Sequence, residues 1–207
     1  MEVHKAIKTR RSVRRYKQDP VSKETILELL QAANLAPSAV NRQPWEFVVV
    51  HRSYLDQLDE VLRKAFTERV AGIGEEKMRE IIKDLSFPPD ENEDKLKGLG
   101  AFYRTLGGAP VTIFVCVPKE EDKSNWRNNI SDASAAVENL MLAACDKGLG
   151  TCWLTGPLRT QERAIASLLD IPEDREIVAL VSLGYPDHQP VMPPKKDVNK
   201  KTRWLGF

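Results

Sequence analysis

The amino-acid sequence predicts an α+β domain in which helices pack around a single sheet. Strand-like apolar runs recur along the chain, but consecutive helical segments separate them, so the strict strand–helix alternation of a doubly wound fold is missing. The chain has 207 residues, of which 42% are hydrophobic and 29% are charged. This length and composition are typical of one globular domain with a substantial core.

The N-terminal part predicts two helices and a strand. A short helix is expected over residues 2–9, and a second helix begins at Ser22, carries Glu24 in its first turn and ends before Pro37. The apolar face of the second helix is expected to consist of Ile26, Leu27, Leu29, Leu30 and Ala33. The β-branched run WEFVVV, residues 45–50, predicts a buried strand.

The middle of the chain predicts helices followed by an irregular segment. Helical spacing relates four apolar residues, Leu55, Leu58, Leu62 and Ala65, and a further helical stretch covers about 75–85. From Ser86 onward the segment SFPPDENEDKLKGLG is polar, with two prolines and an acidic run. This composition favours a mobile excursion such as a lid.

The second half predicts three strands and two helices. The runs PVTIFVCVP (110–118), TCWL (151–154) and EIVALVSLGYP (176–186) are the expected strands. Between the first two, ISDASAAVENLMLAACDKGLG predicts a long central helix that ends at Gly148. Thr160 is expected to cap the other helix.

Charge and cysteine content exclude several classes of protein. A formal net charge of +1 gives no global electrostatic basis for nucleic-acid binding. Cys116, Cys145 and Cys152 form no CxxC pair, so we expect buried thiols rather than a disulfide framework or a metal site. The polar start MEVHKAIKTR and the short apolar run VTIFVCV predict neither a signal peptide nor a membrane span, which favours a cytoplasmic location.

Four arginines surround one serine in the stretch RRSVRR, residues 10–15. Arginine presents a planar fork of donors that matches phosphate oxygens, and a serine hydroxyl adds another donor. In an extended segment Arg10, Ser12 and Arg14 point to one side, whereas in a helical turn Arg10 and Arg14 share a face. Both conformations let Arg10 and Arg14 converge on one anion. The alternative is an ordinary basic surface loop.

Two further stretches carry features of ligand-binding turns. APSAVNRQPW, residues 36–45, joins a helix to a strand, and its Asn41 and Gln43 are suited to reading the edge of a heterocycle. GLGTCWLTGP, residues 148–157, places Gly156 where a ligand can approach the backbone. It is not a dinucleotide-binding fingerprint, because its G-L-G follows a helix rather than a strand. An ordinary capped loop is the alternative for the first stretch.

Taken in order, these motifs resemble those of the nitroreductase family of FMN-dependent oxidoreductases. The resemblance is carried by RRSVR, APSAxNxQPWxFVVV, the Ala-rich helix leading into GLGTCWL and TGP, SLGYP and a basic tail. It implies an α+β sandwich with a mostly antiparallel central sheet flanked by helices, assembled as an intertwined homodimer with two FMN sites at the interface. It also implies a single domain over 1–207, with a variable lid over about 65–108 and an extended tail over 187–207.

The resemblance also assigns FMN-binding positions. The phosphate-binding positions correspond to Arg10, Arg11, Ser12 and Arg14. Lys195 and Lys196 fall where a basic pair follows the GYP turn in the family, with Lys201 and Arg203 as an alternative register.

Two other segments are implied to contact the flavin ring. The loop formed by Pro37, Ser38 and Asn41, with Gln43 beside it, is expected to contact flavin bound mainly by the other subunit. The turn beneath the isoalloxazine corresponds to Leu154, Thr155 and Gly156, whose backbone supplies hydrogen bonds near flavin N5.

The activity implied is a ping-pong transfer of hydride from NADH or NADPH to flavin N5 and then to a nitroaromatic, a quinone or a similar small acceptor. Because the cofactor carries this chemistry, no side chain is assigned as a nucleophile or general base. Phe102, Tyr103 and Trp126 are candidates for the wall of the acceptor pocket, with ordinary packing as the alternative. Reductive dehalogenation, flavin fragmentation and flavin binding without turnover are the alternative functions.

Overall fold

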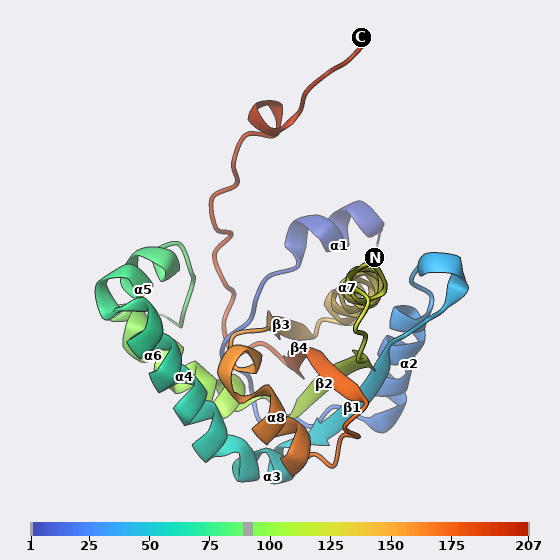
Figure 1. Ribbon diagram of the computed structural model, residues 1–207. Coiled ribbons are helices and arrows are strands. Elements are labelled where there is room, and N and C mark those ends of the chain that lie inside the picture. The colour runs from blue at the N-terminus through green and yellow to red at the C-terminus, as the bar shows by residue number, and fades with distance from the viewer. Residues whose placement is uncertain (1, 89–92, 207) are drawn as a thin grey trace.

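The computed structural model describes residues 2–88 and 93–206, which are built around a four-stranded sheet (Figure 1). The strands are β1 (Glu46–His51), β2 (Val111–Pro118), β3 (Gly150–Leu154) and β4 (Arg175–Gly184). They lie in the order β1-β2-β4-β3, and every neighbouring pair is antiparallel. The expectation of an α+β fold with an antiparallel sheet is therefore confirmed.

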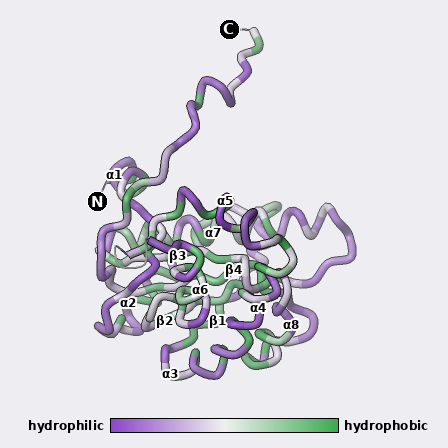
Figure 2. Tube along the Cα trace, turned by 90° about the vertical axis from the view of Figure 1, so that its left-hand side faces the viewer, coloured by the Kyte–Doolittle hydropathy of each residue, from purple (hydrophilic) through white to green (hydrophobic). Residues whose placement is uncertain are grey.

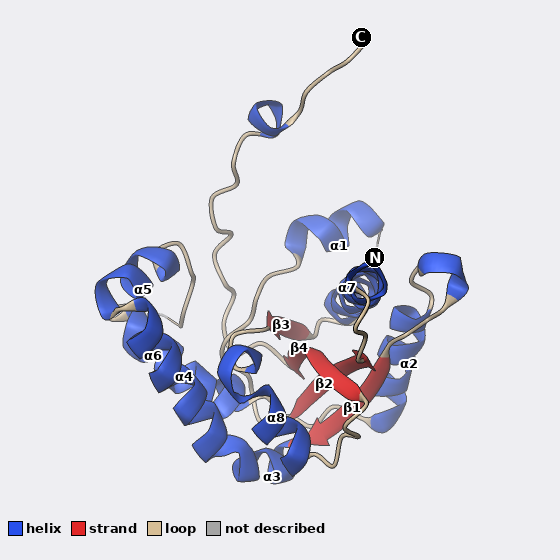
Figure 3. Ribbon diagram, in the orientation of Figure 1, coloured by secondary structure: helices blue, strands red, loops and turns tan. Residues whose placement is uncertain are grey.

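Helices cover both faces of the sheet, as Figure 3 shows. One side carries α2 (Lys23–Asn34) and α7 (Lys123–Asp146). The other side carries α4 (Asp59–Ile73), α6 (Lys95–Thr105) and α8 (Leu158–Leu168). The shorter helices are α1 (Val3–Thr9), α3 (Arg52–Leu55) and α5 (Glu75–Ile82), and 3₁₀ turns cover Ala39–Asn41, Asp56–Leu58, Leu106–Gly108 and Val198–Lys201.

Side chains of the central strand β2 enter two hydrophobic clusters. Ile113 and Val115 pack with the α2 and α7 side, whereas Phe114 and Cys116 pack with the α4, α6 and α8 side. Successive side chains of a strand point to opposite faces, so a strand buried on both faces has a continuous apolar run. This explains why VTIFVCV was recognisable as a strand.

The expectation that WEFVVV is a buried strand is only partly correct. Trp45 and Val50 are buried, but the remaining residues of β1 are half-buried or exposed. β1 is one of two edge strands and pairs with β2 alone, whereas the other edge strand, β3, is also bordered by the N-terminal segment at Thr151. Hydrophobicity within a short run does not distinguish an edge strand from a central one.

Most helices follow the expected signals, but one expected core residue is exposed and two helices begin at other positions than expected. Ser22 caps α2, its Oγ accepting a hydrogen bond from the Thr25 amide at 3.1 Å, but Leu27 is exposed. The helix α7 begins earlier than its apolar pattern, after the capping residue Asp122. Thr160 does not cap α8, which begins at Leu158 after Pro157, because proline suits the start of a helix, where its missing N–H has no partner to lose.

The segment expected to be an irregular excursion becomes a helix from Lys95 onward. Asp94 caps α6 by accepting hydrogen bonds from the amides of Leu96 and Lys97. Residues 96, 99, 102 and 103 of α6 are buried in the core, as is Phe87. Pro88 is described and buried, whereas Pro89, Asp90, Glu91 and Asn92 lie outside the described residues. The irregular segment is therefore shorter than its composition suggested.

The two ends of the chain run differently. Residues 10–16 follow α1 in an extended conformation, and the Val13 amide donates to the Thr151 carbonyl of β3 at 2.9 Å. The tail beyond Asp187 is largely exposed and leaves the body of the molecule (Figure 1). Figure 2 shows that hydrophilic residues predominate along it, whereas hydrophobic residues gather in the sheet. Within the described ranges, no helix combines the length and the apolar character that crossing a bilayer requires.

Candidate anion-binding site

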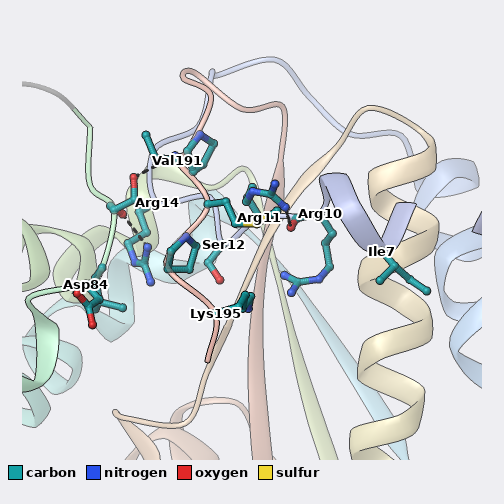
Figure 4. Close-up of a pocket in the computed structure, with 13 residues that line it drawn as sticks. Ile7, Arg10, Arg11, Ser12, Arg14, Asp84, Val191 and Lys195 are labelled. Carbon is teal, nitrogen blue, oxygen red and sulfur yellow. Dashed lines mark hydrogen bonds between the residues drawn. The ribbon is translucent and has the colours of Figure 1, made fainter. Parts of the chain in front are cut away.

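Three segments that are distant in the sequence wall one cavity of about 170 Å³ (Figure 4). They are the extended N-terminal segment, residues 84–86 and residues 190–195 of the tail. The lining residues are Ile7, Arg10, Arg11, Ser12, Arg14, Asp84, Leu85, Ser86, Pro190, Val191, Met192, Pro193 and Lys195. Four of these are cations, whereas the one carboxylate among them, Asp84, is exposed.

The conformation of the N-terminal segment brings Arg10, Ser12 and Arg14 to the same wall of the cavity. The helix α1 ends at Thr9, and Val13 and Tyr16 are buried on the side away from solvent. The extended arrangement is therefore the one adopted, and the helical alternative is not. Alternation along an extended chain gives the three donor side chains a common direction.

Arg14 is held in place by contacts with residues far along the chain. Its Nη1 donates a hydrogen bond to the Ser86 carbonyl at 2.7 Å, and its guanidinium lies 5.2 Å from the centre of the Phe87 ring. The Ser86 hydroxyl in turn accepts the Val191 amide at 3.3 Å. Ser86 therefore joins all three walls of the cavity through Arg14 and Val191, both of which are labelled in Figure 4.

Close packing of Gly107 also fixes the backbone of Arg14. Gly107 has a φ of +71°, and a Cβ added there would lie 2.4 Å from the Arg14 carbonyl oxygen. The Gly107 carbonyl accepts the Tyr16 amide at 2.9 Å. A residue with a side chain would therefore displace the segment that carries the cations.

Arg10 and Arg11, the other two arginines that line the cavity, have different partners. The Nε of Arg10 lies 3.6 Å from a carboxylate oxygen of Glu138 on α7. The Nη1 of Arg11 donates to the carbonyls of Lys8 and Arg10, both at 2.7 Å. Arg11 borders the cavity, but its guanidinium satisfies carbonyls at the C-terminal end of α1, where cations are favourable.

The tail contributes Lys195 to the cavity. Of the four basic residues considered in the sequence, Lys195 is the one that lines it, while Lys196, Lys201 and Arg203 lie on exposed parts of the tail. Arginine forks, a serine hydroxyl and an ammonium group together form a donor set suited to a multiply charged oxyanion such as a phosphate.

The loop of residues 37–43 lies elsewhere, on the opposite side of α7 from the cavity (Figure 1). Val40, Asn41 and Gln43 all have positive φ, at 47°, 59° and 47°. The Ser38 hydroxyl accepts the Gln43 amide at 3.0 Å, and Gln43 Nε2 donates to Asn41 Oδ1 at 2.9 Å. Three left-handed residues without glycine make this a strained loop, of the kind that structure retains at functional positions.

A buried acid anchors this loop. Both carboxylate oxygens of Asp132, on α7, accept the Ala39 amide, at 3.2 and 3.1 Å. Asp132 is only 8% exposed. Asp132 was not among the residues expected at the site, although an acidic residue within the apolar face of an Ala-rich helix indicates a buried carboxylate that needs a partner. Ser86 and Val191 had no such signal, because their role arises from contacts between distant segments.

The turn at residues 154–156 lies at the end of β3. Leu154 is buried and Thr155 is exposed. A Cβ at Gly156 would lie 1.8 Å from the Tyr103 hydroxyl, so the small size of Gly156 makes room for Tyr103. Of the candidate pocket aromatics, Phe102 and Tyr103 are buried and Trp126 is exposed. Neither this turn nor the 37–43 loop lines the cation-rich cavity.

The cysteines are free thiols. Burial raises the pKa of Cys116 to about 12, and burial also raises the pKa of Cys152. These two agree with the expectation of buried thiols, but Cys145 is only half-buried because it lies near the end of α7, 3.5 Å from the Thr9 hydroxyl.

Comparison with known proteins agrees with this architecture. The model of the nitroreductase family matches residues 7–185. An NADH dehydrogenase of Thermus thermophilus is 34% identical over 186 residues, covering 86% of this chain and 83% of the relative. A 4-nitrobenzoate reductase of a Nocardioides species is 32% identical over 210 residues, covering 88% and 80%.

Solved structures share the fold. The crystal structure of an FMN and NADPH-dependent nitroreductase from sphigopyxis sp. strain HMH matches with a TM-score of 0.76 over 100% of both chains, at 20% identity. The family match runs from the last residues of α1 to just beyond β4 and includes the extended arginine segment. This chain belongs to the nitroreductase family.

Proposed function

We propose that this chain is an FMN-dependent NAD(P)H oxidoreductase that reduces a nitroaromatic, a quinone or a similar small acceptor. The observation that carries the proposal is the cavity walled by Arg10, Ser12, Arg14 and Lys195. Membership of the nitroreductase family supports it. The similar proteins named as an NADH dehydrogenase, a 4-nitrobenzoate reductase and an FMN and NADPH-dependent nitroreductase also support it.

In this proposal the cavity holds the FMN phosphate. Arg10 and Arg14 supply charged N–H donors, Ser12 supplies a hydroxyl, and Lys195 adds a point charge from the tail. This donor set fits a phosphate dianion, because oxyanions favour several charge-assisted hydrogen bonds. Arg11 acts mainly by holding the end of α1, and Lys196 stands beside the site as a second cation of the tail.

The turn formed by Leu154, Thr155 and Gly156 is the proposed support for the isoalloxazine. When bound, FMN supplies a hydride acceptor at N5 that couples oxidation of NAD(P)H to reduction of the second substrate. The chain's own contribution is to bind and orient. Leu154 is buried and fixes the turn, Thr155 is exposed, and Gly156 is half-buried. No side chain is assigned as a general base.

We further propose that the protein works as a homodimer in which the loop of Pro37, Ser38, Asn41 and Gln43 contacts flavin held by a second copy. Within one chain this loop and the cavity lie on opposite sides of α7 (Figure 1). Val40 is 92% exposed although its φ is 47°. An exposed apolar side chain on a strained loop is better explained by a partner surface than by solvent.

The first test is the absorption spectrum of the purified protein, followed by anaerobic addition of NADH and then of NADPH. We expect a flavin spectrum that bleaches with at least one donor and recovers when 4-nitrobenzoate or a quinone is added. A flavin spectrum that neither donor bleaches would favour flavin binding without turnover. A protein that cannot be reconstituted with FMN would refute the proposal, and a halophenol or oxygen as the preferred acceptor would favour the dehalogenating or flavin-fragmenting alternative.

The second test removes the phosphate contacts. Each charge-assisted hydrogen bond contributes about 1.5–3 kcal/mol, so Arg10→Ala with Arg14→Ala should weaken FMN binding on the order of 100-fold or more. The control is Arg63→Ala with Arg104→Ala, which removes two exposed arginines paired with Glu60 and Asp59 away from the cavity. Equal FMN retention on dialysis by both double variants would show that the assignment of the phosphate site is wrong.

A further inference from the structure

We propose that the acceptor site selects anionic aromatic acceptors, through the side chains of Tyr103, Arg69 and Arg159. This inference rests on the proposed function, because it places the acceptor beside the turn that supports the isoalloxazine. The three residues belong to three helices, α6, α4 and α8, that pack together at one end of β3.

Tyr103 is a buried residue whose hydroxyl lies against the turn. The residue is 4% exposed, and its Oη occupies the space where a Cβ of Gly156 would stand. Its ring is tilted against Phe66, with ring centres 5.5 Å apart. Among the described residues this hydroxyl has no hydrogen-bond partner. A phenol hydroxyl that lies at the turn and is not used by a protein acceptor is available to donate a hydrogen bond to a ligand placed there.

Arg69 on α4 and Arg159 on α8 are the two cations whose charges act on Tyr103. Arg69 lies one helical turn beyond Phe66 on α4, so both residues share a face of that helix. Arg159 follows Gly156 by three residues, and its amide donates to the Gly156 carbonyl at 3.3 Å. Burial raises the pKa of Tyr103, and the charges of Arg69 and Arg159 oppose part of that rise, as expected for cations close to the phenol.

The carboxylates nearest to these arginines in the sequence are already engaged. Glu68 accepts a hydrogen bond from Gln161 Nε2 at 2.7 Å and faces Lys64. Glu162 accepts the Ile177 amide at 3.1 Å. Across the ranges that the structure describes, Arg69 and Arg159 form no ion pair, and Arg69 is nevertheless half-buried.

Three other arginines on the same side of the sheet, unlike Arg69 and Arg159, form ion pairs. Arg63 pairs with Glu60 at 2.8 Å, Arg79 with Glu75 and Asp94 at 2.9 Å, and Arg104 with Asp59 at 3.4 Å. Arg69 and Arg159 therefore differ from these three arginines in having charges that no carboxylate of the described residues neutralises. A guanidinium fork matches a carboxylate in both charge and geometry, which a neutral acceptor cannot exploit. An aromatic ring carrying an acidic group satisfies the phenol and the arginines together.

The experiment compares 4-nitrobenzoate with 4-nitrobenzamide, two nitroaromatics of similar size that differ in charge. We measure kcat/KM for both, and the Kd of benzoate and benzamide from their perturbation of the flavin spectrum, which needs no turnover. The wild-type holoenzyme should prefer the acid in both measurements, and the preference should weaken at high salt because charge attraction is screened. Arg69→Gln and Arg159→Gln should each lower the acid-to-amide ratio about 10-fold, the effect of losing one charged contact.

Control variants separate selectivity from folding. Arg63→Gln lies on the same helix as Arg69, removes one exposed charge and should leave the ratio unchanged. Tyr103→Phe should weaken both ligands, because it removes a hydrogen bond rather than a charge. FMN content and the circular dichroism spectrum of each variant report intact folding. A wild-type ratio at or below one, or an equal loss for acid and amide in Arg69→Gln, would overturn the inference. Absence of bound FMN in the wild type would instead refute the proposed function.

Discussion

Gly107 connects the stability of the fold to the geometry of the cation-rich cavity, and Gly107→Ala tests that connection. The residue has a φ of +71°, and an added Cβ would lie 2.4 Å from the carbonyl oxygen and 2.7 Å from the carbonyl carbon of Arg14. Both atoms belong to the backbone, so no side-chain rotation relieves the overlap. The chain around Arg14 must move by at least about 0.6 Å to restore an ordinary 3.0 Å contact.

Two physical effects set the magnitude. An L-residue in the left-handed region costs roughly 1–2 kcal/mol. Overpacking of a closely fitted position adds about 1–3 kcal/mol. Gly107→Ala should therefore lower the free energy of unfolding by about 2–5 kcal/mol. Because the displaced carbonyl belongs to Arg14 and the neighbouring Tyr16 amide bonds to Gly107, the same change should weaken FMN binding.

The matched control is Gly148→Ala. Gly148 has nearly the same φ, +73°, but an added Cβ there meets nothing within 4 Å. It carries the conformational cost without the overlap, so it should lower the free energy of unfolding by only about 1–2 kcal/mol. Equilibrium urea unfolding of both variants, followed by circular dichroism, measures the difference, and flavin fluorescence measures FMN affinity.

The reasoning fails if Gly107→Ala destabilises the protein no more than Gly148→Ala, because the close approach to Arg14 would then have no energetic consequence. A second outcome is also informative. If Gly107→Ala is strongly destabilising but binds FMN as tightly as the wild type, Gly107 supports the fold without positioning the arginine segment.

Two further predictions concern titrating groups. Cys145 should be the first cysteine to react with a thiol reagent at about pH 8, because it is only half-buried. Burial raises the pKa of Cys116 to about 12 and also raises the pKa of Cys152, so both should react more slowly. Faster labelling of Cys152 than of Cys145 in the folded protein would contradict this prediction. The hydrogen bond from Arg79 holds the pKa of Asp94 below its usual range, so the pair contributes stability above the unfolded carboxyl pKa of about 4 and loses it as pH falls through the lower folded pKa. Arg79→Gln should therefore be less stable than the wild type at about pH 7, and the difference should shrink as the pH falls through the lowered folded pKa of Asp94; a difference that does not shrink on acidification would exclude this pairing as its cause.

Most helices and strands could be predicted because caps and hydrophobic periodicity depend only on residues close together in the sequence. Ser22 caps its helix by accepting a hydrogen bond from an amide only three residues away. Successive side chains of β2 enter opposite clusters, which gives a strand buried on both faces a continuous apolar run. The errors arose where position in the fold decides. WEFVVV has the composition of a central strand, but β1 lies at the edge of the sheet. The segment from Ser86 to Gly100 was expected to be irregular, but from Lys95 onward it belongs to α6, which packs against α4.

At the candidate site, the residue types alone define the chemistry of the donors: arginines and a serine within one short segment, a basic tail, and turns with small and polar residues. The folded chain shows that the arginine segment is extended, and it shows which of these groups meet. It placed Lys195, rather than Lys196, Lys201 or Arg203, in the cavity. It also joined Ser86 to Arg14 across 72 residues and brought Tyr103 against Gly156. Such contacts depend on how distant segments pack, and short-range patterns carry no information about the distance between segments.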